Sequence, residues 1–257
     1  MATPLPARVV EHQVAVFRRF WRGSVMFYVL NPVLFLAAMG VGLGGLVEER
    51  TGNVDGVPYL TFVAAGLLAA SAMLGATAES LWPIMAGTKW VRTFHAMVAT
   101  PLRPVDVYTG IVAWTAARGA VGASIFLAVA AVLGAVPSPW GIAAVPAAAL
   151  SAAAFAAPLT AFSASQETDA RFPLIMRIGV MPLFLFSGTF FPISQLPDSI
   201  RPLSVLSPLW HGVELCRGAT TGSIDALPAV GHVVVLAACV GAGWLWGRRT
   251  FTRKLAQ

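Results

Sequence analysis

A few ionisable side chains stand alone in stretches of the chain that are otherwise apolar. An ionisable group held away from water needs a partner, and such groups commonly lie on the path of an ion or a substrate. Arg118 lies deepest in its stretch, and Glu79 and Arg177 are expected near the ends of theirs, where they can pair across helices. The spacing leaves open whether these three residues are structural, as in an ion pair between Glu79 and Arg118, or contact a bound molecule.

A second polar group lies in SPLWHGVELCRG, where His211 and Glu214 are three residues apart. A helix would place both on one face, together with Arg217. A histidine and a carboxylate at this spacing can begin a metal site in a helix bundle, but no second E-x-x-H and no matching carboxylate pair is present. We therefore predict a structural network without a metal. The alternative is an enzyme that uses His211 and Glu214 for acid–base chemistry.

Motifs that bind nucleotides or catalyse hydrolysis are absent from the sequence. No G-x-x-x-x-G-K-[ST] occurs, and the two lysines, Lys89 and Lys254, do not follow glycine-rich loops. H-E-x-x-H, G-x-S-x-G and C-x-x-C are also absent. Cys216 and Cys239 are expected to be packing residues or free thiols. The chain is therefore predicted to hold no cofactor and not to hydrolyse ATP by itself.

The composition defines the elements that must hold these residues. Of 257 residues, 57% are apolar and 11% are charged, whereas a soluble domain carries about 25% charged residues. The mean hydropathy is +0.76. A soluble globule could not bury so much apolar surface, which excludes a cytosolic enzyme, a disordered chain and a disulfide-rich secreted domain. We predict an all-α polytopic membrane protein, a single transmembrane domain of residues 1–257, with room for six spans at about 20 residues each.

Polar turns separate the apolar stretches and mark the ends of the spans. Before the first span, Val9, Val14, Phe17 and Trp21 recur at helical spacing among arginines, which predicts an amphipathic interfacial helix at residues 5–22. The six spans are expected at residues 24–46, 58–85, 105–136, 142–163, 172–190 and 228–246.

The basic residues are distributed unevenly among the connecting segments. The formal net charge is +6, and membrane proteins accumulate arginine and lysine in their cytoplasmic loops. With both termini inside, most basic residues face the cytoplasm. Only Arg50, Arg201 and Arg217 are then outside, beside acids such as Glu48. We therefore predict a multi-pass protein of the cytoplasmic membrane with both termini cytoplasmic, and no nucleic-acid partner.

The segment between the second and third spans, residues 89–104, carries a short apolar face. Phe94, Met97 and Val98 share one side of a short helix, and Pro101 then forces a turn before the next span. Such a helix on the cytoplasmic side is suited to docking into a groove on a soluble partner. The alternative is a loop that lies on the membrane.

The segment at residues 192–227 is too apolar for a solvated loop and too interrupted to span a membrane. The fifth span breaks at Ser187-Gly188 and again at Phe191-Pro192, and further prolines divide the segment into two short helical pieces. We predict helices that re-enter the membrane from outside, because irregular backbone at that depth must be buried in protein or line a cavity.

Both segments resemble the ABC-2 family of exporter membrane subunits, in particular its nodulation-type and daunorubicin-resistance-type permeases. The resemblance is carried by ATPLRPVDVYTG at 99–110 and by FLFSGTFFPISQLPDSIRPLSVLSPLWHGVELCRG at 184–218. The second stretch matches a family pattern of the form [FS]G-x-x-[FY]P-x-x-x-LP…P[LW]xHxxExxR. The matching residues are Ser187, Gly188, Phe191, Pro192, Leu196, Pro197, Pro208, His211, Glu214 and Arg217.

The resemblance implies a permease of the type V ABC exporter kind, with re-entrant outer helices before its last span. Its partners would be two copies of an ABC ATPase subunit, which bind ATP and Mg²⁺, a second permease copy or a paralogue, and membrane lipids. Residues 92–104 would form a coupling helix in a groove of the ATPase, beside the helix at 5–22. The implied coupling residues are Arg92, Phe94, Met97, Val98, Pro101, Leu102 and Arg103.

On the outer side, the resemblance implies that the re-entrant segment forms a gate. The cargo would be amphipathic or hydrophobic, such as a lipid, a glycolipid, a polysaccharide or a drug, and it would be exported along apolar side chains of spans one, two and five. The implied gate residues are Phe191, Pro192, Pro197, Pro208, His211, Glu214 and Arg217. Two rival functions stay open: an intramembrane enzyme that uses His211 and Glu214, and a membrane scaffold that transports nothing.

Overall fold

A computed structural model describes residues 5–255, with the exception of the side chains of Phe20, residues 24–29, Asn31, Val41, Glu48 and Thr51. The outward position predicted for the Glu48 carboxylate therefore lies outside the described part. Residues 5–255 form helices joined by turns, without a strand and with an isolated bridge between Val54 and Val57. The predicted all-α fold is confirmed for these residues.

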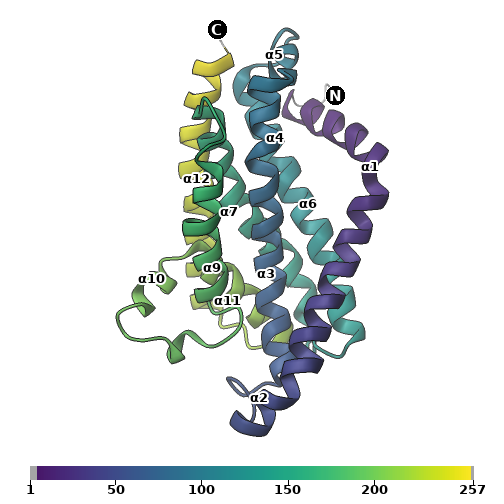
Figure 1. The fold of residues 1–257 in the computed structure, drawn as a ribbon, viewed down its shortest axis with the longest axis vertical. Helices are drawn as coiled ribbons and strands as arrows, with labels where there is room; N and C mark the ends of the chain where they lie inside the picture. The colour runs from purple at the N-terminus through teal and green to yellow at the C-terminus, as the bar shows by residue number, and fades with distance from the viewer. Residues whose placement is uncertain (1–4, 256–257) are drawn as a thin grey trace.

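Five long helices form the body of the molecule, and shorter helices lie at its two ends (Figure 1). The long helices are α1 (Leu5–Leu36), α3 (Tyr59–Ser80), α6 (Pro104–Val132), α7 (Ala144–Ser165) and α12 (Ala226–Leu255). The shorter α-helices are α2 (Gly44–Thr51), α4 (Trp82–Met85), α5 (Thr93–Val98), α8 (Phe172–Leu174), α9 (Met181–Phe186), α10 (Arg201–Val205) and α11 (Pro208–Thr221). The π-helical turns are η1 (Ala37–Leu43), η2 (Ala86–Trp90) and η4 (Ile175–Val180), and the 3-10 turns are η3 (Pro139–Ala143) and η5 (Ile193–Gln195).

Four helical segments among the described residues are long and apolar enough to cross a membrane. They are Tyr59–Trp90, Pro104–Val132, Pro139–Ser165 and Ala226–Leu255. Two shorter apolar stretches, Pro32–Val47 and Phe172–Phe186, lie where spans one and five were predicted. The fifth span was expected to reach residue 190, but its helix ends at Phe186, because Gly188 adopts φ = +77° and turns the chain.

The predicted amphipathic segment at 5–22 is continuous with the helix that follows it. α1 runs without a break from Leu5 to Leu36 and continues through η1 into α2. Gly23 lies at the predicted junction, and one glycine inside a helix costs only about 1 kcal/mol, which is too little to end a helix that continues on both sides. In Figure 1 the first turns of α1 start beside α5 and run outward, and the helix then bends and descends along α6.

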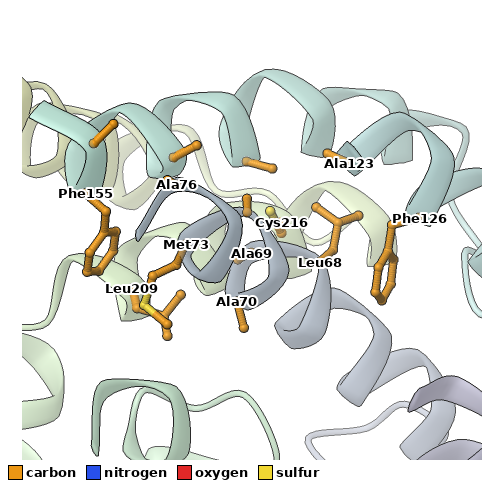
Figure 2. Close-up of a cluster of buried hydrophobic side chains, with 14 of the residues drawn as sticks. Leu68, Ala69, Ala70, Met73, Ala76, Ala123, Phe126, Phe155, Leu209 and Cys216 are labelled. Carbon is orange, nitrogen blue, oxygen red and sulfur yellow. The ribbon is translucent and has the colours of Figure 1, made fainter. Parts of the chain in front are cut away.

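α3 is the central helix of the bundle. It is apolar on all sides, as expected for a helix that is buried all round, and α6, α7 and α11 pack against it. Figure 2 shows Leu68 of α3 beside Phe126 of α6, with Cys216 of α11 close by. Small residues permit close helix contacts around this centre, for example where Ala152 of α7 meets Gly119 of α6.

The two ends of the described chain lie at the same end of the bundle, together with α5 (Figure 1). This end also carries the basic residues of segment 89–104 and of the last turns of α12. The rule that basic residues gather in the cytoplasm predicts that it is the cytoplasmic end. We call it the inner end, and we call the opposite end, with α2 and α11, the outer end.

This topology is tested by labelling single cysteines in a chain whose Cys216 and Cys239 are replaced by alanine. Cysteines placed at Asn53 and Ser223, both exposed at the outer end, should react with an impermeant thiol reagent in intact cells. A cysteine at Thr168, exposed at the inner end, should react only after the cells are permeabilised. Labelling of position 168 alone in intact cells would contradict a six-span topology with both ends inside.

Candidate functional site

The predicted coupling segment lies at the inner end between two fixed boundaries. Arg92 adopts the left-handed conformation, φ = 59°, directly before α5. The next helix begins at Pro104 because Asp106 caps its first turn. The Asp106 carboxylate accepts hydrogen bonds from the backbone N–H of Arg103 at 3.0 Å and from its guanidinium Nε at 2.9 Å. The short helix α5 is therefore held between a turn and a cap.

The apolar face of α5 is directed partly toward its own chain. Phe94 is only 4% exposed, and its ring lies 6.0 Å from that of Phe251 in α12. Met97, Val98 and Leu102 are half-buried against the same core. This corrects the expectation that Phe94 is an exposed residue for docking, because the end of α12 covers it.

Two exposed apolar residues beside α5 lie inside the predicted segment 89–104 but were not among the coupling residues named from the sequence. Trp90 is 58% exposed and Val91 is 69% exposed, just before the turn at Arg92. The sequence KWVR, in which two apolar residues stand between two basic ones at a helix end, was the available signal. Exposed apolar side chains at the inner end suit a docking surface better than the buried ring of Phe94.

α5 lies beside the first turns of α1, with a groove of about 350 Å³ between them. Arg8 and His12 line one side of the groove and Met97 lines the other. Val9 is buried where α1 crosses α6, and a Cβ at Gly110 would lie 2.5 Å from that of Val9. Only glycine at position 110 permits this crossing, which brings the N-terminal segment next to α5.

A carboxylate at the inner end joins three parts of the chain. Glu167, in the loop between α7 and α8, pairs with Lys254 at the end of α12 and with Lys89, just before the coupling segment. These ammonium groups, that of Lys254 first, lower the pKa of Glu167 to about 2. The carboxylate is therefore ionised at neutral pH and holds both lysines.

Deeper in the bundle, Glu79 of α3 and Arg118 of α6 form an ion pair. Thr115 also makes a side-chain hydrogen bond to Glu79, and the Arg118 guanidinium lies 5.0 Å from the ring centre of Phe17 in α1. The structure thus shows the pairing that the spacing left open. The two charges come from different helices, and each neutralises the other at a place with little access to water.

This ion pair lies between two hollows. One hollow is a cavity of about 250 Å³ between α1, α3 and α6, on the side of the ion pair that faces the membrane centre. Its walls include Phe35, Leu74 and Phe126. On the inner side is a hollow of about 350 Å³ that Trp114 and Met97 help to line. Both hollows include Glu79 and Arg118 in their walls. A molecule that passed between them would meet the ion pair.

Arg177 takes no part in this pair. It is exposed in η4, on the helical segment formed by α8, η4 and α9. Exposed apolar residues follow the same segment at helical spacing. They are Leu174, Ile178, Met181 and Leu185. The segment therefore presents an apolar surface that carries one cation.

At the outer end, Arg217 joins the predicted gate segment to the bundle. Its guanidinium donates to the Glu214 carboxylate at 2.7 Å and to the backbone carbonyl of Gly188 at 2.6 Å. It also lies 3.9 Å from the ring centre of Phe62 in α3. This cation, whose side chain is 12% exposed, thus links α11, the turn after α9 and the central helix.

The turn after α9 packs directly against α3. A Cβ at Gly66 would lie 2.5 Å from the carbonyl oxygen of Thr189, so the backbone of the turn touches the helix. The hydroxyl groups of Ser187 and Ser207 lie 2.7 Å apart and are buried. Irregular backbone is therefore enclosed by protein at this place, as a non-helical segment in a membrane requires.

His211 pairs with His232 of α12, a partner that the sequence did not predict, and the Glu214 carboxylate acts electrostatically on the imidazole of His232. The Nδ1 of His211 lies 2.7 Å from Nδ1 of His232, and the ring of Trp210 packs against both imidazoles. His211 and Glu214 are three residues apart, but the partner of His211 is on α12, whereas Glu214 pairs with Arg217 on α11 itself. Among the described residues, no group of three or more His, Cys, Asp or Glu side chains could hold a metal ion.

The prolines of the predicted gate differ in their place in the helices and in their exposure to solvent. Pro208 starts α11, and the Ser207 hydroxyl before it accepts a hydrogen bond from the N–H of Leu209 at 3.2 Å. Pro192 is buried, Phe191 is half-buried and Pro197 is exposed. Pro101 of the coupling segment is exposed as well.

The four long apolar helices and the ion pair enclosed between them are typical of a helical membrane protein. A sequence model of the family described as "ABC-2 type transporter" matches residues 13–220, and the chain belongs to this family. The match covers the coupling segment, the ion pair and most of the outer segment. Membership of this family points to the membrane subunit of an ABC transporter, not to a catalytic enzyme.

Three relatives of this chain are each named "Nodulation protein J". The chain is 35% identical to that of Sinorhizobium fredii over 213 residues, which cover 80% of each chain. It is 30% identical to that of Rhizobium leguminosarum bv. viciae over 249 residues, which cover 94% of each chain. It is 32% identical to that of Rhizobium leguminosarum bv. trifolii over 231 residues, 86% of this chain and 87% of the relative.

Proposed function

We propose that the chain is the permease subunit of an ATP-driven exporter, which moves an amphipathic or hydrophobic cargo out across the cytoplasmic membrane. The arrangement of the inner end carries this proposal. α5 is held by the turn at Arg92, the cap at Asp106 and the ion pairs of Glu167. Exposed Trp90 and Val91 beside it supply an apolar contact for an ATPase subunit. ATP and Mg²⁺ would be bound by that subunit.

The working unit would contain two permeases and two ATPase subunits. The surface of α8, η4 and α9 supports this, because an exposed arginine among apolar side chains is poorly suited to contact with lipid tails. A second copy or a paralogue would cover Arg177 and its apolar neighbours. The stretches Pro32–Val47 and Phe172–Phe186 would complete six spans, with both termini in the cytoplasm.

The cargo would use the cavity between α1, α3 and α6. Its walls are mostly apolar, and its single ion pair lies at the inner side, which suits a molecule with an apolar body and a polar head. The sequence resemblance implied a cargo path along spans one, two and five. The cavity lies along spans one, two and three, so the proposed path keeps the first two spans and uses the third in place of the fifth. The outer segment at 192–227 would be re-entrant and would gate the exit.

The test places a larger side chain in the wall of the cavity, at a position where an added Cβ meets no other atom. A Cβ at Gly75, in the cavity wall, meets no atom within 4 Å, and neither does one at Gly241 in α12, away from the cavity. Each glycine is changed to leucine, and the chain is purified with its ATPase and reconstituted in liposomes. Lipids, glycolipids and drugs are tested for stimulated ATP turnover and for movement across the membrane.

Cargo stimulation that is lost in Gly75→Leu and kept in Gly241→Leu would support the proposal. Failure of any ATPase to co-purify with the wild-type chain would favour the scaffold. A chemical activity on lipid that depends on a metal at His211 and Glu214 would favour the enzyme.

A further inference from the structure

A further pocket opens at the inner end. It has a volume of about 850 Å³ and lies between the start of α1, the start of α6 and the last turns of α12. Its walls include Trp244 and four arginines. Three of these arginines, in α12, are not among the residues implied in coupling to the ATPase. The arginines are Arg103, Arg248, Arg249 and Arg253.

The pocket has an excess of positive charge. Its one carboxylate, Asp106, is engaged by Arg103 through two guanidinium hydrogen bonds of 2.9 and 3.0 Å. Among the side chains that the structure describes, no carboxylate forms an ion pair with the three arginines of α12. Arg249 and Arg253 are four residues apart, so they lie on the same face of the helix and are both exposed.

Trp244 sets the depth of the pocket relative to the membrane. Its indole N–H donates to the Thr109 hydroxyl at 3.0 Å, and the Arg248 guanidinium lies 5.4 Å from the centre of its ring. Tryptophan is enriched at the level of the lipid headgroups. At 1.5 Å per residue, the arginines at 248 to 253 are about 6 to 14 Å further along the helix, on its cytoplasmic side. The arginines therefore lie at and just beyond the level of the headgroups, within reach of lipid phosphates for their long side chains.

The walls of the pocket are rigid. The Tyr108 hydroxyl lies 2.8 Å from the carbonyl oxygen of Gly243 and 2.9 Å from that of Ala157, so α6 is joined to α12 and α7. Gly247 packs directly against the Tyr108 ring. The cations are therefore held on helices with a fixed spacing before any ligand arrives, which lowers the cost of binding.

We propose that this pocket binds the phosphate headgroup of an anionic phospholipid of the inner leaflet. Guanidinium groups match phosphate oxygens in geometry and charge, and basic pockets between membrane helices on the cytoplasmic side are suited to such headgroups. The pocket opens at the membrane surface beside exposed apolar residues of α12 such as Leu245, which would meet the acyl chains. The inference rests on the cytoplasmic orientation of the inner end and does not depend on the cargo.

The experiment compares two variants that each remove two positive charges from the same membrane face. Arg249→Gln with Arg253→Gln changes the pocket, and Arg18→Gln with Arg19→Gln changes exposed arginines of α1 outside it. Each protein is reconstituted in nanodiscs of phosphatidylcholine with a minor fraction of phosphatidylglycerol. Native mass spectrometry then counts the lipids of each kind that stay bound after the nanodisc is removed.

The wild type and the Arg18/Arg19 variant should retain phosphatidylglycerol in preference to phosphatidylcholine. Each surface arginine contributes about fivefold to the binding of an anionic lipid, so the Arg249/Arg253 variant should lose on the order of 25-fold. Equal loss in both variants would show an effect of general charge and would overturn the site. Full displacement of the lipid by excess inorganic phosphate would assign the pocket to a soluble phosphate ligand. Because the readout is bound lipid, failure of the export proposal leaves this test unchanged.

Discussion

Replacing Val91 by aspartate is expected to abolish ATP-driven transport while the permease remains folded. Val91 is 69% exposed at the inner end, so its own chain loses little packing when it is changed. An aspartate in an apolar contact with the ATPase would be a charge without a partner. We expect a loss of about 2–3 kcal/mol, which weakens the contact on the order of 100-fold. Co-purification of the ATPase and transport in liposomes measure the effect.

Val132→Asp is the matched control for this variant. It introduces the same charge at a position that is 88% exposed at the end of α6, on the outer side. This control should bind the ATPase and transport normally. Met97→Asp and Val98→Asp, which the sequence suggests first, are weaker tests because both side chains are half-buried against their own chain. Normal transport by the Val91 variant would remove this surface from the coupling role.

Replacing Arg217 by methionine is expected to release the outer segment. Methionine keeps much of the length and the apolar contact with Phe62, but it leaves the Glu214 carboxylate without its cation and the Gly188 carbonyl without its donor. Removing one partner of a fully buried ion pair costs about 3–5 kcal/mol. The Glu214 side chain is 33% exposed, so water offsets part of this cost and we expect a loss of about 1–3 kcal/mol. The variant should show a lower thermal midpoint in detergent and a leak of small solutes through the liposome membrane.

The pairing itself is tested with Glu214→Gln and with both changes together. Glu214→Gln keeps the shape and removes the charge, so it should lower transport or make the gate leaky while ATPase binding at the inner end stays intact. The double variant has no uncompensated charge and should be more stable than Arg217→Met alone. A double variant as unstable as the sum of the two single ones would show that Arg217 and Glu214 act independently.

Local rules predicted much of the fold. Composition and apolar run length predicted membrane helices, because each feature depends only on the residues within one segment. Pro104 predicted the start of α6 to within a residue, and the Ser187-Gly188 break was found because glycine permits the backbone angle that ends α9. The segment predicted at 5–22 and the first span are one continuous helix, since one glycine at position 23 does not outweigh the helix on either side. The motif at 184–218 pointed to the family to which the chain belongs.

Only the tertiary structure decided which side chains meet. It pairs Glu79 with Arg118 and His211 with His232, turns Phe94 toward α12, and brings Arg103 to the same pocket as the arginines near the end of the chain. Sequence spacing gives the faces of one helix, but it does not give the rotation and depth of that helix against its neighbours. Those are set by close contacts between helices, such as Gly110 on Val9 and Gly66 on Thr189, whose partners are far apart in the chain.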